Sequence, residues 1–131
     1  MEQKINYKLK ILDLGCGCNK IKDHFINTKL NIIGYDYISY NESIECDLSN
    51  LPDENESIDI CIFSQSLMGY NWRKYIDEAF RVLRYNGEII IAESSKRYHE
   101  IKNYIQNYKI KYEDYNETNR WFYLHLINDK L

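Results

Sequence analysis

The sequence has one proline, five glycines and no long apolar run among its 131 residues. Hydrophobic residues make up 44% of the chain, which is enough for a core and too apolar for a disordered protein. The longest apolar runs fall far short of the roughly 18 residues that a transmembrane helix needs. Residues 1–10 alternate polar and apolar side chains and lack the apolar centre of a signal peptide. We therefore expect a soluble, intracellular protein with a single domain, residues 1–131.

Positive charge is missing from one long stretch of the chain. Between Leu30 and Trp72 there is no lysine or arginine, whereas eight carboxylates give that stretch a charge of −8. A nucleic acid would be repelled there. From Ser95 onward seven basic side chains face five acidic ones, so the only basic bias is small.

The four cysteines, Cys16, Cys18, Cys46 and Cys61, lie in or beside apolar runs. Disulfide scaffolds instead place cysteines in the polar loops of small secreted chains, so we expect reduced thiols. The pair Cys16-x-Cys18 has no second pair or histidine cluster that would complete four ligands, and no metal site is expected.

Short apolar runs alternate with stretches of helical periodicity. Strands are predicted at residues 9–14, 31–36, 43–47, 58–64 and 88–93, and helices at 18–27, 71–83 and 98–107. Two late strands, 110–115 and 120–128, face each other across a polar turn and are expected to be antiparallel. This order predicts an α/β fold with a mostly parallel sheet. Residues 37–42 are too few for a crossover helix, so a loop is expected there.

Acidic residues follow or close three successive strands. Asp13 precedes a tight turn formed by Gly15 and Gly17, where the backbone can approach a ligand closely. Asp36 ends the second strand, where a carboxylate can accept both hydroxyls of a ribose. Asp47 ends the third strand and can accept from an exocyclic amine, and Leu48 offers an apolar wall for an adenine ring. Together these residues predict a site for an adenosine cofactor.

The cofactor predicted by this pattern is S-adenosyl-L-methionine. A dinucleotide fingerprint has a third glycine three residues after the second, and that position is Lys20 here. Asp13 would also repel a pyrophosphate beside the glycines, whereas it suits the ammonium of an amino acid. S-adenosylmethionine carries that ammonium together with a ribose and an adenine.

With these motifs the sequence resembles the class I S-adenosylmethionine-dependent methyltransferases, whose sheet is Rossmann-like. More narrowly, it is similar to the ribosomal RNA-processing, nucleomethylin-like adenine N1 methyltransferases. The similar stretches are Cys46-Asp47-Leu48, the acidic loop to Ser57, residues 63–69 (Phe-Ser-Gln-Ser-Leu-Met-Gly), residues 77–83 and 92–93, and Ser95 with Arg97. The resemblance implies a seven-stranded sheet with the last strand antiparallel between the fifth and sixth. It also implies cofactor contacts at Gly15, Gly17, Asp36, Asp47, Leu48 and Ser64.

The sequence departs from that family pattern in two places. The family has helices before the first strand that cover the cofactor and help to hold the substrate, whereas this chain begins almost at the first strand. The usual proline near residue 85 is replaced by Arg84-Tyr85-Asn86, which still precedes an Asn-Gly turn. We therefore expect a partner protein or a second copy to supply the cover and the positive charge, and weak RNA binding by the chain alone.

The loop of residues 64–72 is the expected substrate surface, because ligands of such sheets bind outside the carboxyl ends of the strands. Ser66, Asn71 and Trp72 are candidates for holding or stacking a base. The alternative is structural, with Trp72 packing at the start of a helix and Asn71 as its N-cap. No catalytic base is assigned, because adenine N1 already carries a lone pair and alignment is the main task.

The leading functional hypothesis is an RNA-directed methyltransferase, by resemblance one that acts on adenine N1 of ribosomal RNA. One alternative is a non-catalytic subunit that binds S-adenosylmethionine and supports a partner. Another is a methyltransferase for a small molecule or a protein that shares only the cofactor half. The expected compartment is the cytoplasm or the nucleus and nucleolus.

Overall fold

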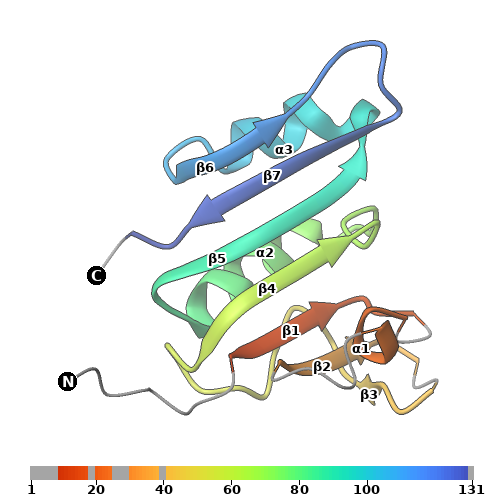
Figure 1. Ribbon diagram of the computed structural model, residues 1–131, viewed down its shortest axis with the longest axis vertical. Coiled ribbons are helices and arrows are strands. Elements are labelled where there is room, and N and C mark those ends of the chain that lie inside the picture. The colour runs from red at the N-terminus through yellow and green to blue at the C-terminus, as the bar shows by residue number, and fades with distance from the viewer. Residues whose placement is uncertain (1–8, 18–19, 25–29, 39–40, 130–131) are drawn as a thin grey trace.

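The computed structural model describes residues 9–17, 20–24, 30–38 and 41–129 (Figure 1). Seven strands form one sheet in the order β3-β2-β1-β4-β5-β7-β6. The strands are β1 (Lys10–Leu14), β2 (Asn31–Asp36), β3 (Ile44–Glu45), β4 (Ile58–Ser64), β5 (Leu83–Ser94), β6 (Lys109–Asp114) and β7 (Trp121–Ile127). The helices are α1 (Lys20–His24), α2 (Trp72–Val82), the 3-10 turn η1 (Ser95–Arg97) and α3 (Tyr98–Tyr104).

The predicted topology is confirmed. Strands β3, β2, β1, β4 and β5 are parallel to one another, and β7 lies antiparallel between β5 and β6. Between β2 and β3 the described residues contain no helix, as expected for so short a connection. The parallel strands therefore bring their carboxyl ends to a single edge of the sheet, on the right in Figure 1.

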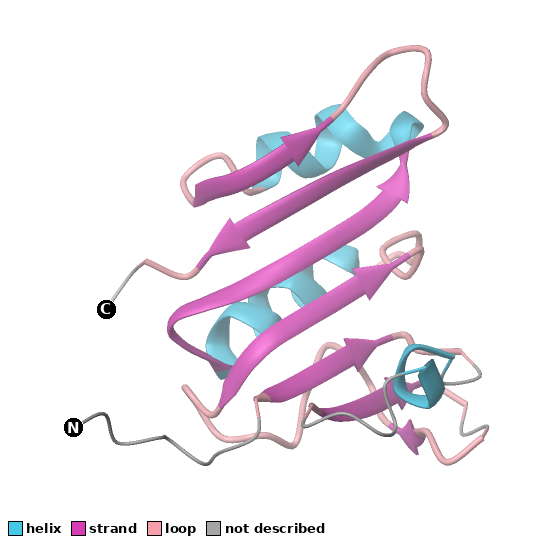
Figure 2. Cartoon of the chain, in the orientation of Figure 1, coloured by secondary structure: helices cyan, strands magenta, loops and turns pink. Residues whose placement is uncertain are grey.

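The main core lies between the sheet and helices α2 and α3, which Figure 2 shows behind the strands. Along β5, Ile89 and Ile91 are fully buried while Ile90 between them is half-buried, as the period of two in a strand requires. Helix α2 buries Trp72, Ile76, Ala79 and Val82, a spacing of three to four residues that places them on one face. Burying a side chain of this size contributes roughly 1.5–3 kcal/mol, so α2 is held chiefly by this face.

Several element boundaries differ from the predicted ones. Strand β3 has only two residues instead of residues 43–47, because its backbone pairing with β2 covers only Tyr35 and Asp36. Helix α1 is described only at residues 20–24; residues 18, 19 and 25–27 of the predicted helix lie outside the described residues. Helix α3 ends at Tyr104, three residues earlier than predicted.

The Asn-Gly pair bends a continuous strand instead of preceding one. Strand β5 begins at Leu83, and Asn86 adopts a left-handed φ of 64° inside it. The pairing of β4 with β5 shifts register between Ile58 and Ile60, beside this bend. A Cβ on Gly87 would lie 2.9 Å from the carbonyl oxygen of Arg84, so the bend needs glycine there.

Candidate functional site

Three carboxylates come together at the carboxyl edge of the sheet. Asp13 lies in β1, Asp36 closes β2, and Asp47 follows β3 by two residues. Strands β1, β2 and β3 are neighbours in the sheet (Figure 1), so the three acids belong to adjacent strands at its carboxyl edge. The structure thus brings together the acids that the sequence placed at successive strand ends.

The turn after β1 is tied to the end of β2. The backbone N–H groups of Gly15 and Cys16 donate to the carbonyl of Tyr35, at 2.7 and 3.1 Å. The N–H of Gly17 donates to Asp36 Oδ2 at 2.8 Å. Gly15 and Gly17 have φ values of 81° and 56°, a region that glycine occupies without strain. This explains why both turn positions are glycine.

Asp36 is fixed by the backbone on both sides. Its Oδ1 accepts from the N–H of Tyr37 at 2.7 Å, while Oδ2 accepts from Gly17. A carboxylate oxygen has two lone pairs, so each oxygen retains acceptor capacity for a ligand hydroxyl. The side chain is therefore held in place for a bidentate contact.

Asp13 is only 2% exposed and lies at the base of the turn. Burial, together with the nearby charge of Asp36, raises the pKa of Asp13 to about 6. Burial and the two carboxylates also raise the pKa of the Cys16 thiol to about 11, so Cys16 is a neutral thiol. A cationic ligand group beside Asp13 would offset this accumulation of negative charge.

Asp47 is exposed and ionised. Its Oδ1 accepts from the backbone N–H and the hydroxyl of Ser49, and these contacts lower the pKa of Asp47. Leu48, the predicted apolar wall, is 8% exposed and belongs to the core, so little of its surface is left for a ring. Large exposed apolar side chains follow Asp36 instead, at Tyr37 and Ile38.

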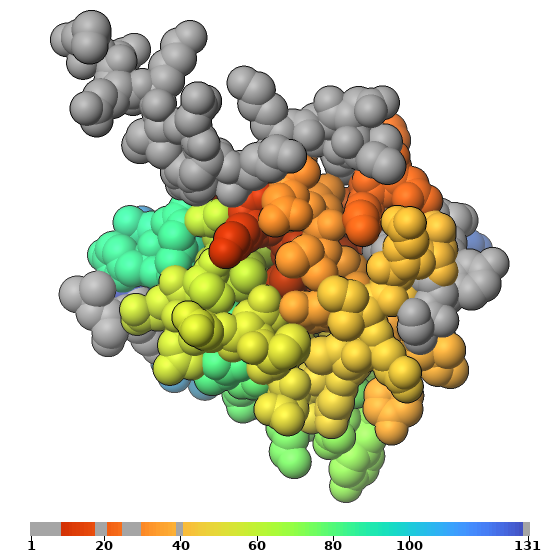
Figure 3. Space-filling model, turned by 90° about the horizontal axis from the view of Figure 1, so that it is seen from below, coloured from red at the N-terminus to blue at the C-terminus, as the bar shows by residue number. Residues whose placement is uncertain are grey.

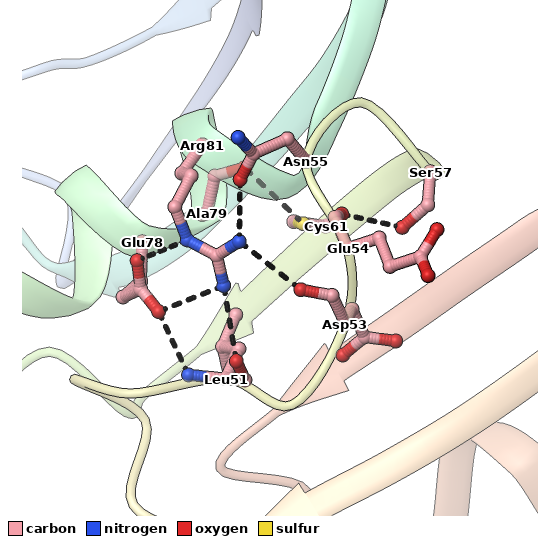
Figure 4. Close-up of polar contacts among 9 residues, drawn as sticks. All are labelled: Leu51, Asp53, Glu54, Asn55, Ser57, Cys61, Glu78, Ala79 and Arg81. Carbon is pink, nitrogen blue, oxygen red and sulfur yellow. Dashed lines mark hydrogen bonds and ion pairs between the residues drawn. The ribbon is translucent and has the colours of Figure 1, made fainter.

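The acidic loop after Asp47 is anchored to α2 by Arg81 (Figure 4). The Arg81 guanidinium donates to Glu78 of its own helix and to the carbonyls of Leu51 and Asp53. The Glu78 carboxylate in turn accepts the N–H of Leu51 at 2.8 Å. Glu78 and Arg81, both within residues 77–83, thus hold the loop that follows Asp47 in place.

A cleft of about 460 Å³ opens at the glycine turn. Its lining, which we call the glycine cleft, comprises Asp13, Gly15, Cys16, Gly17, Ile21, Ser64 and Gln65. Gln65 has a φ of 56°, which is uncommon for a residue with a side chain, and its N–H donates to the carbonyl of Ala92 at 2.8 Å. The strained backbone of Gln65 turns the chain directly after β4, beside the cleft.

The loop after β4 is clamped at Leu67 by two residues from the end of β5 and η1. Glu93 accepts the N–H of Leu67 at 2.8 Å, and Arg97 donates to its carbonyl at 2.6 Å. Ser66 packs against the glycine turn, since a Cβ on Gly15 would lie 2.4 Å from that of Ser66. Its hydroxyl is buried and has no hydrogen-bond partner in the described part of the chain.

A second hollow, of about 890 Å³, continues from this loop. We call it the aromatic groove; it is lined by Met68, Gly69, Tyr70, Asn71, Trp72, Arg73, Lys74, Arg97 and Glu100. The Trp72 side chain is 4% exposed and packs edge-to-face on Tyr104, as the structural alternative expects, so little of its surface is left to stack on a base. Asn71 occupies the N-cap position, but its side chain makes no capping hydrogen bond.

Metal and membrane features are absent from the described residues. No group of three His, Cys, Asp or Glu side chains in that part of the chain lies close enough to hold a metal ion. Nor does any helix described there have the length and apolarity needed to cross a membrane. The described cysteines, Cys16, Cys46 and Cys61, are free thiols.

Comparison with known proteins identifies the family. A family model with the description "Hypothetical methyltransferase" matches residues 1–129. The chain belongs to this methyltransferase family.

Two curated relatives carry more specific names. Ribosomal RNA-processing protein 8 of Dictyostelium discoideum is 41% identical over 124 residues, which make up 92% of this chain and 32% of that protein. The 25S rRNA (adenine(645)-N(1))-methyltransferase of Schizosaccharomyces pombe is 39% identical over 90 residues, 67% of this chain and 28% of that protein. The chain thus spans about a third of the length of these relatives.

The fold is shared with solved methyltransferases. The Burkholderia thailandensis 1,6-didemethyltoxoflavin-N1-methyltransferase, solved with its substrate and S-adenosylhomocysteine, has a TM-score of 0.77. The match covers 94% of this chain and 72% of that one at 12% identity, so it supports the fold alone. The Rossmann-like methyltransferase architecture expected from the sequence is therefore confirmed.

Several residues of the site carry no signal in the sequence. Only their exposure distinguishes Tyr37 and Ile38 from core residues, and the same is true of Tyr70, which is 100% exposed while Trp72 is buried. Glu93 lies in a stretch similar to the family, but nothing in the sequence shows that its side chain reaches Leu67.

Proposed function

We propose that this chain is an S-adenosylmethionine-dependent methyltransferase domain that acts on ribosomal RNA, at N1 of an adenine. The observation that carries the proposal is the row of Asp13, Asp36 and Asp47 on three adjacent strand ends beside the glycine turn. The relatives named for ribosomal RNA processing and adenine N1 methylation supply the substrate class.

The donor set fits S-adenosylmethionine. Asp36, with both oxygens oriented by backbone N–H groups, would accept the two ribose hydroxyls. Asp13 would lie with the cationic amino-acid end at the glycine cleft, and Asp47 would accept from the adenine amine through its Oδ2. We assign the apolar contact with the adenine to Tyr37 and Ile38 in place of Leu48. Gly15, Gly17 and Ser64 would contact the cofactor through their backbone or short side chains.

Methyl transfer to adenine N1 does not require a catalytic side chain. The bound sulfonium supplies an activated methyl group. The lone pair of adenine N1 forms the new N–CH3 bond while the S–CH3 bond breaks, so no base is needed to remove a proton. The protein's part is alignment, which can lower the barrier by several kcal/mol. The clamp of Glu93 and Arg97 on Leu67 holds the loop that would face the acceptor base, with Ser66 and Asn71 as positioning candidates.

We also propose that a partner or a further protein segment contributes to RNA binding. The edge with β3 and the acidic loop, seen from below in Figure 3, is formed mainly by the stretch without lysine or arginine. Phosphates are repelled from such a surface, so RNA binding by the chain alone is expected at a Kd of about 10⁻⁵ M or weaker. A role on ribosomal RNA agrees with the nuclear or nucleolar alternative for its compartment.

The experiment that tests the proposed function supplies methyl-labelled S-adenosylmethionine and total RNA to the chain, followed by nucleoside analysis of the RNA. Label in 1-methyladenosine from ribosomal RNA supports it. Cofactor binding without transfer would favour the non-catalytic subunit. Label in protein or small molecules would favour a methyltransferase that shares only the cofactor half with the RNA enzymes.

A further inference from the structure

The aromatic groove begins where the glycine cleft ends. Gln65 lines the cleft, Met68 lines the groove, and only Ser66 and Leu67 separate them. Leu67 is the clamped residue, so the two hollows are held at a fixed spacing by Glu93 and Arg97. With the cofactor at the glycine cleft, a target base beside its methyl group would have its neighbouring nucleotide near the groove.

The groove carries two large apolar side chains that are not buried. Tyr70 is fully exposed, and Met68 is largely exposed. Trp72, two residues further along the chain, is buried, and the guanidinium of Arg73 lies 4.3 Å from the centroid of its ring. The ring of Tyr70 is therefore the aromatic surface of the groove that is open to solvent, where an unpaired base can stack.

The groove also carries two cations, of which Lys74 lies near enough to Asp47 to help lower the pKa of that carboxyl. Arg73 and Lys74 form no ion pair with any residue of the described part of the chain, whereas Arg97 is paired with Glu100 at 2.5 Å. Both side chains are exposed. They come immediately after the long stretch that lacks lysine and arginine, so the boundary between the acidic and basic surfaces lies at this groove.

We infer that the aromatic groove is a subsite for the nucleotide next to the target base in unpaired RNA. Tyr70 stacks on the flanking base, and Arg73 and Lys74 contact phosphates. The acidic surface on the other side of the cleft repels the phosphates of the same strand. The flanking RNA therefore lies on the groove side of the site. This inference rests on the proposed function for its substrate class, but it assigns residues that the cofactor site does not use.

The test measures binding of a short, unpaired, adenine-containing RNA by fluorescence anisotropy, with a duplex of the same sequence as a second probe. Tyr70→Ala is expected to weaken binding of the unpaired RNA about tenfold, Tyr70→Phe to retain it, and neither to change binding of the duplex. The double variant Arg73→Gln/Lys74→Gln is expected to weaken both RNAs and to reduce the salt slope by about 1.4, as for two lost phosphate contacts on a single strand.

Matched controls lie at the opposite end of the sheet. Tyr85→Ala removes another exposed tyrosine, and Lys109→Gln removes an exposed lysine at the start of β6. Neither variant is expected to alter RNA binding. S-adenosylhomocysteine binding is measured by calorimetry for every variant and should stay within about threefold of the unsubstituted chain.

Two outcomes would overturn the inference: groove variants that bind unpaired RNA like the unsubstituted chain, or control variants that lose as much affinity as the groove variants. Absence of any RNA binding at about 1 mM, ten times a non-specific Kd of about 10⁻⁴ M, would do the same. If S-adenosylhomocysteine binding is intact in any of these outcomes, the proposed cofactor site is still supported. Failure of the unsubstituted chain to bind S-adenosylhomocysteine would count against the proposed function itself.

Discussion

Glu93 and Leu67 are 26 residues apart in the chain, yet the buried carboxylate of Glu93 accepts the backbone N–H of Leu67 at 2.8 Å. Because Glu93 closes β5 and Leu67 lies beyond β4, this contact joins the ends of two parallel strands. The loop that separates the glycine cleft from the aromatic groove is therefore held by Glu93, together with Arg97, which donates to the carbonyl of Leu67.

Replacement of Glu93 tests its part in holding the loop. Glu93→Ala leaves the N–H of Leu67 without its partner, so unfolding in urea should show a loss of about 1–3 kcal/mol. Glu93→Gln keeps an acceptor oxygen and should recover most of the stability. Exposed Glu117 offers a control, since Glu117→Ala should change stability by less than about 0.5 kcal/mol. Equal stability of all three variants would show that the contact does not hold the loop.

Asp13 is expected to lower the stability of the protein without ligand. Its pKa of about 6 lies above the ordinary value of 3.8, so the folded protein binds this proton more tightly than the unfolded chain. The group's contribution is therefore most favourable below about pH 4 and declines as the pH rises to about 6. Asp13→Asn should stabilise the ligand-free protein by about 1–3 kcal/mol at pH 7, with the difference disappearing near pH 4.

The same variant should bind S-adenosylmethionine more weakly, because it lacks the charge that faces the ammonium. Thermal unfolding across this pH range, with calorimetry at pH 7, measures both effects. Lower stability of Asp13→Asn at pH 7 would contradict the proposed role of the buried charge.

Alanine substitutions at Gly15, Gly17 and Gly69 distinguish the effect of backbone strain from that of a steric clash. Gly15→Ala combines a φ of 81° with a Cβ contact of 2.4 Å to Ser66, so it should abolish cofactor binding or destabilise the fold by more than about 2 kcal/mol. Gly17→Ala has the positive φ but open space around its Cβ, and should cost about 1–2 kcal/mol.

Gly69→Ala is the control, because its nearest contact, to Tyr75 Oη, is an ordinary 3.6 Å. Adding Ser66→Gly to Gly15→Ala should recover part of the loss by removing the clash. No recovery in the double variant would mean that Ser66 does not confine Gly15.

Arg81 is expected to stabilise the acidic loop through geometry more than through charge. Its guanidinium donates to several acceptors at once, an arrangement that the ammonium of lysine cannot reproduce. Arg81→Ala and Arg81→Lys should both lower the unfolding free energy by about 1–2 kcal/mol, allowing for partial exposure. Arg120→Ala, an exposed arginine outside this network, should have little effect. Full stability of Arg81→Lys in urea would refute the geometric role.

The strands of a mostly parallel sheet and the row of acids were predictable because each depends on local pattern, whereas the place of β7 between β5 and β6 was implied by the family resemblance. Apolar runs ending in Asp13 or Asp36 mark the buried strands, and parallel strands must end at one edge of the sheet. What could not be predicted were contacts between distant residues. The burial of Trp72, the exposure of Tyr70 and the clamp on Leu67 all depend on how α2 and the end of β5 pack. Similarly, the bend at Asn86 was predicted, but its place inside β5 depends on pairing with β4 and β7.

The central claim is that the carboxyl edge of the sheet binds S-adenosylmethionine through Asp36. Calorimetric titration of S-adenosylhomocysteine into the unsubstituted chain and into Asp36→Ala, with circular dichroism to verify the fold, tests it most directly. The account predicts binding by the unsubstituted chain and a loss of about 1.5–3 kcal/mol in the folded variant, roughly ten- to 150-fold in Kd. Equal affinity of the two folded proteins, or no binding by either, would contradict it.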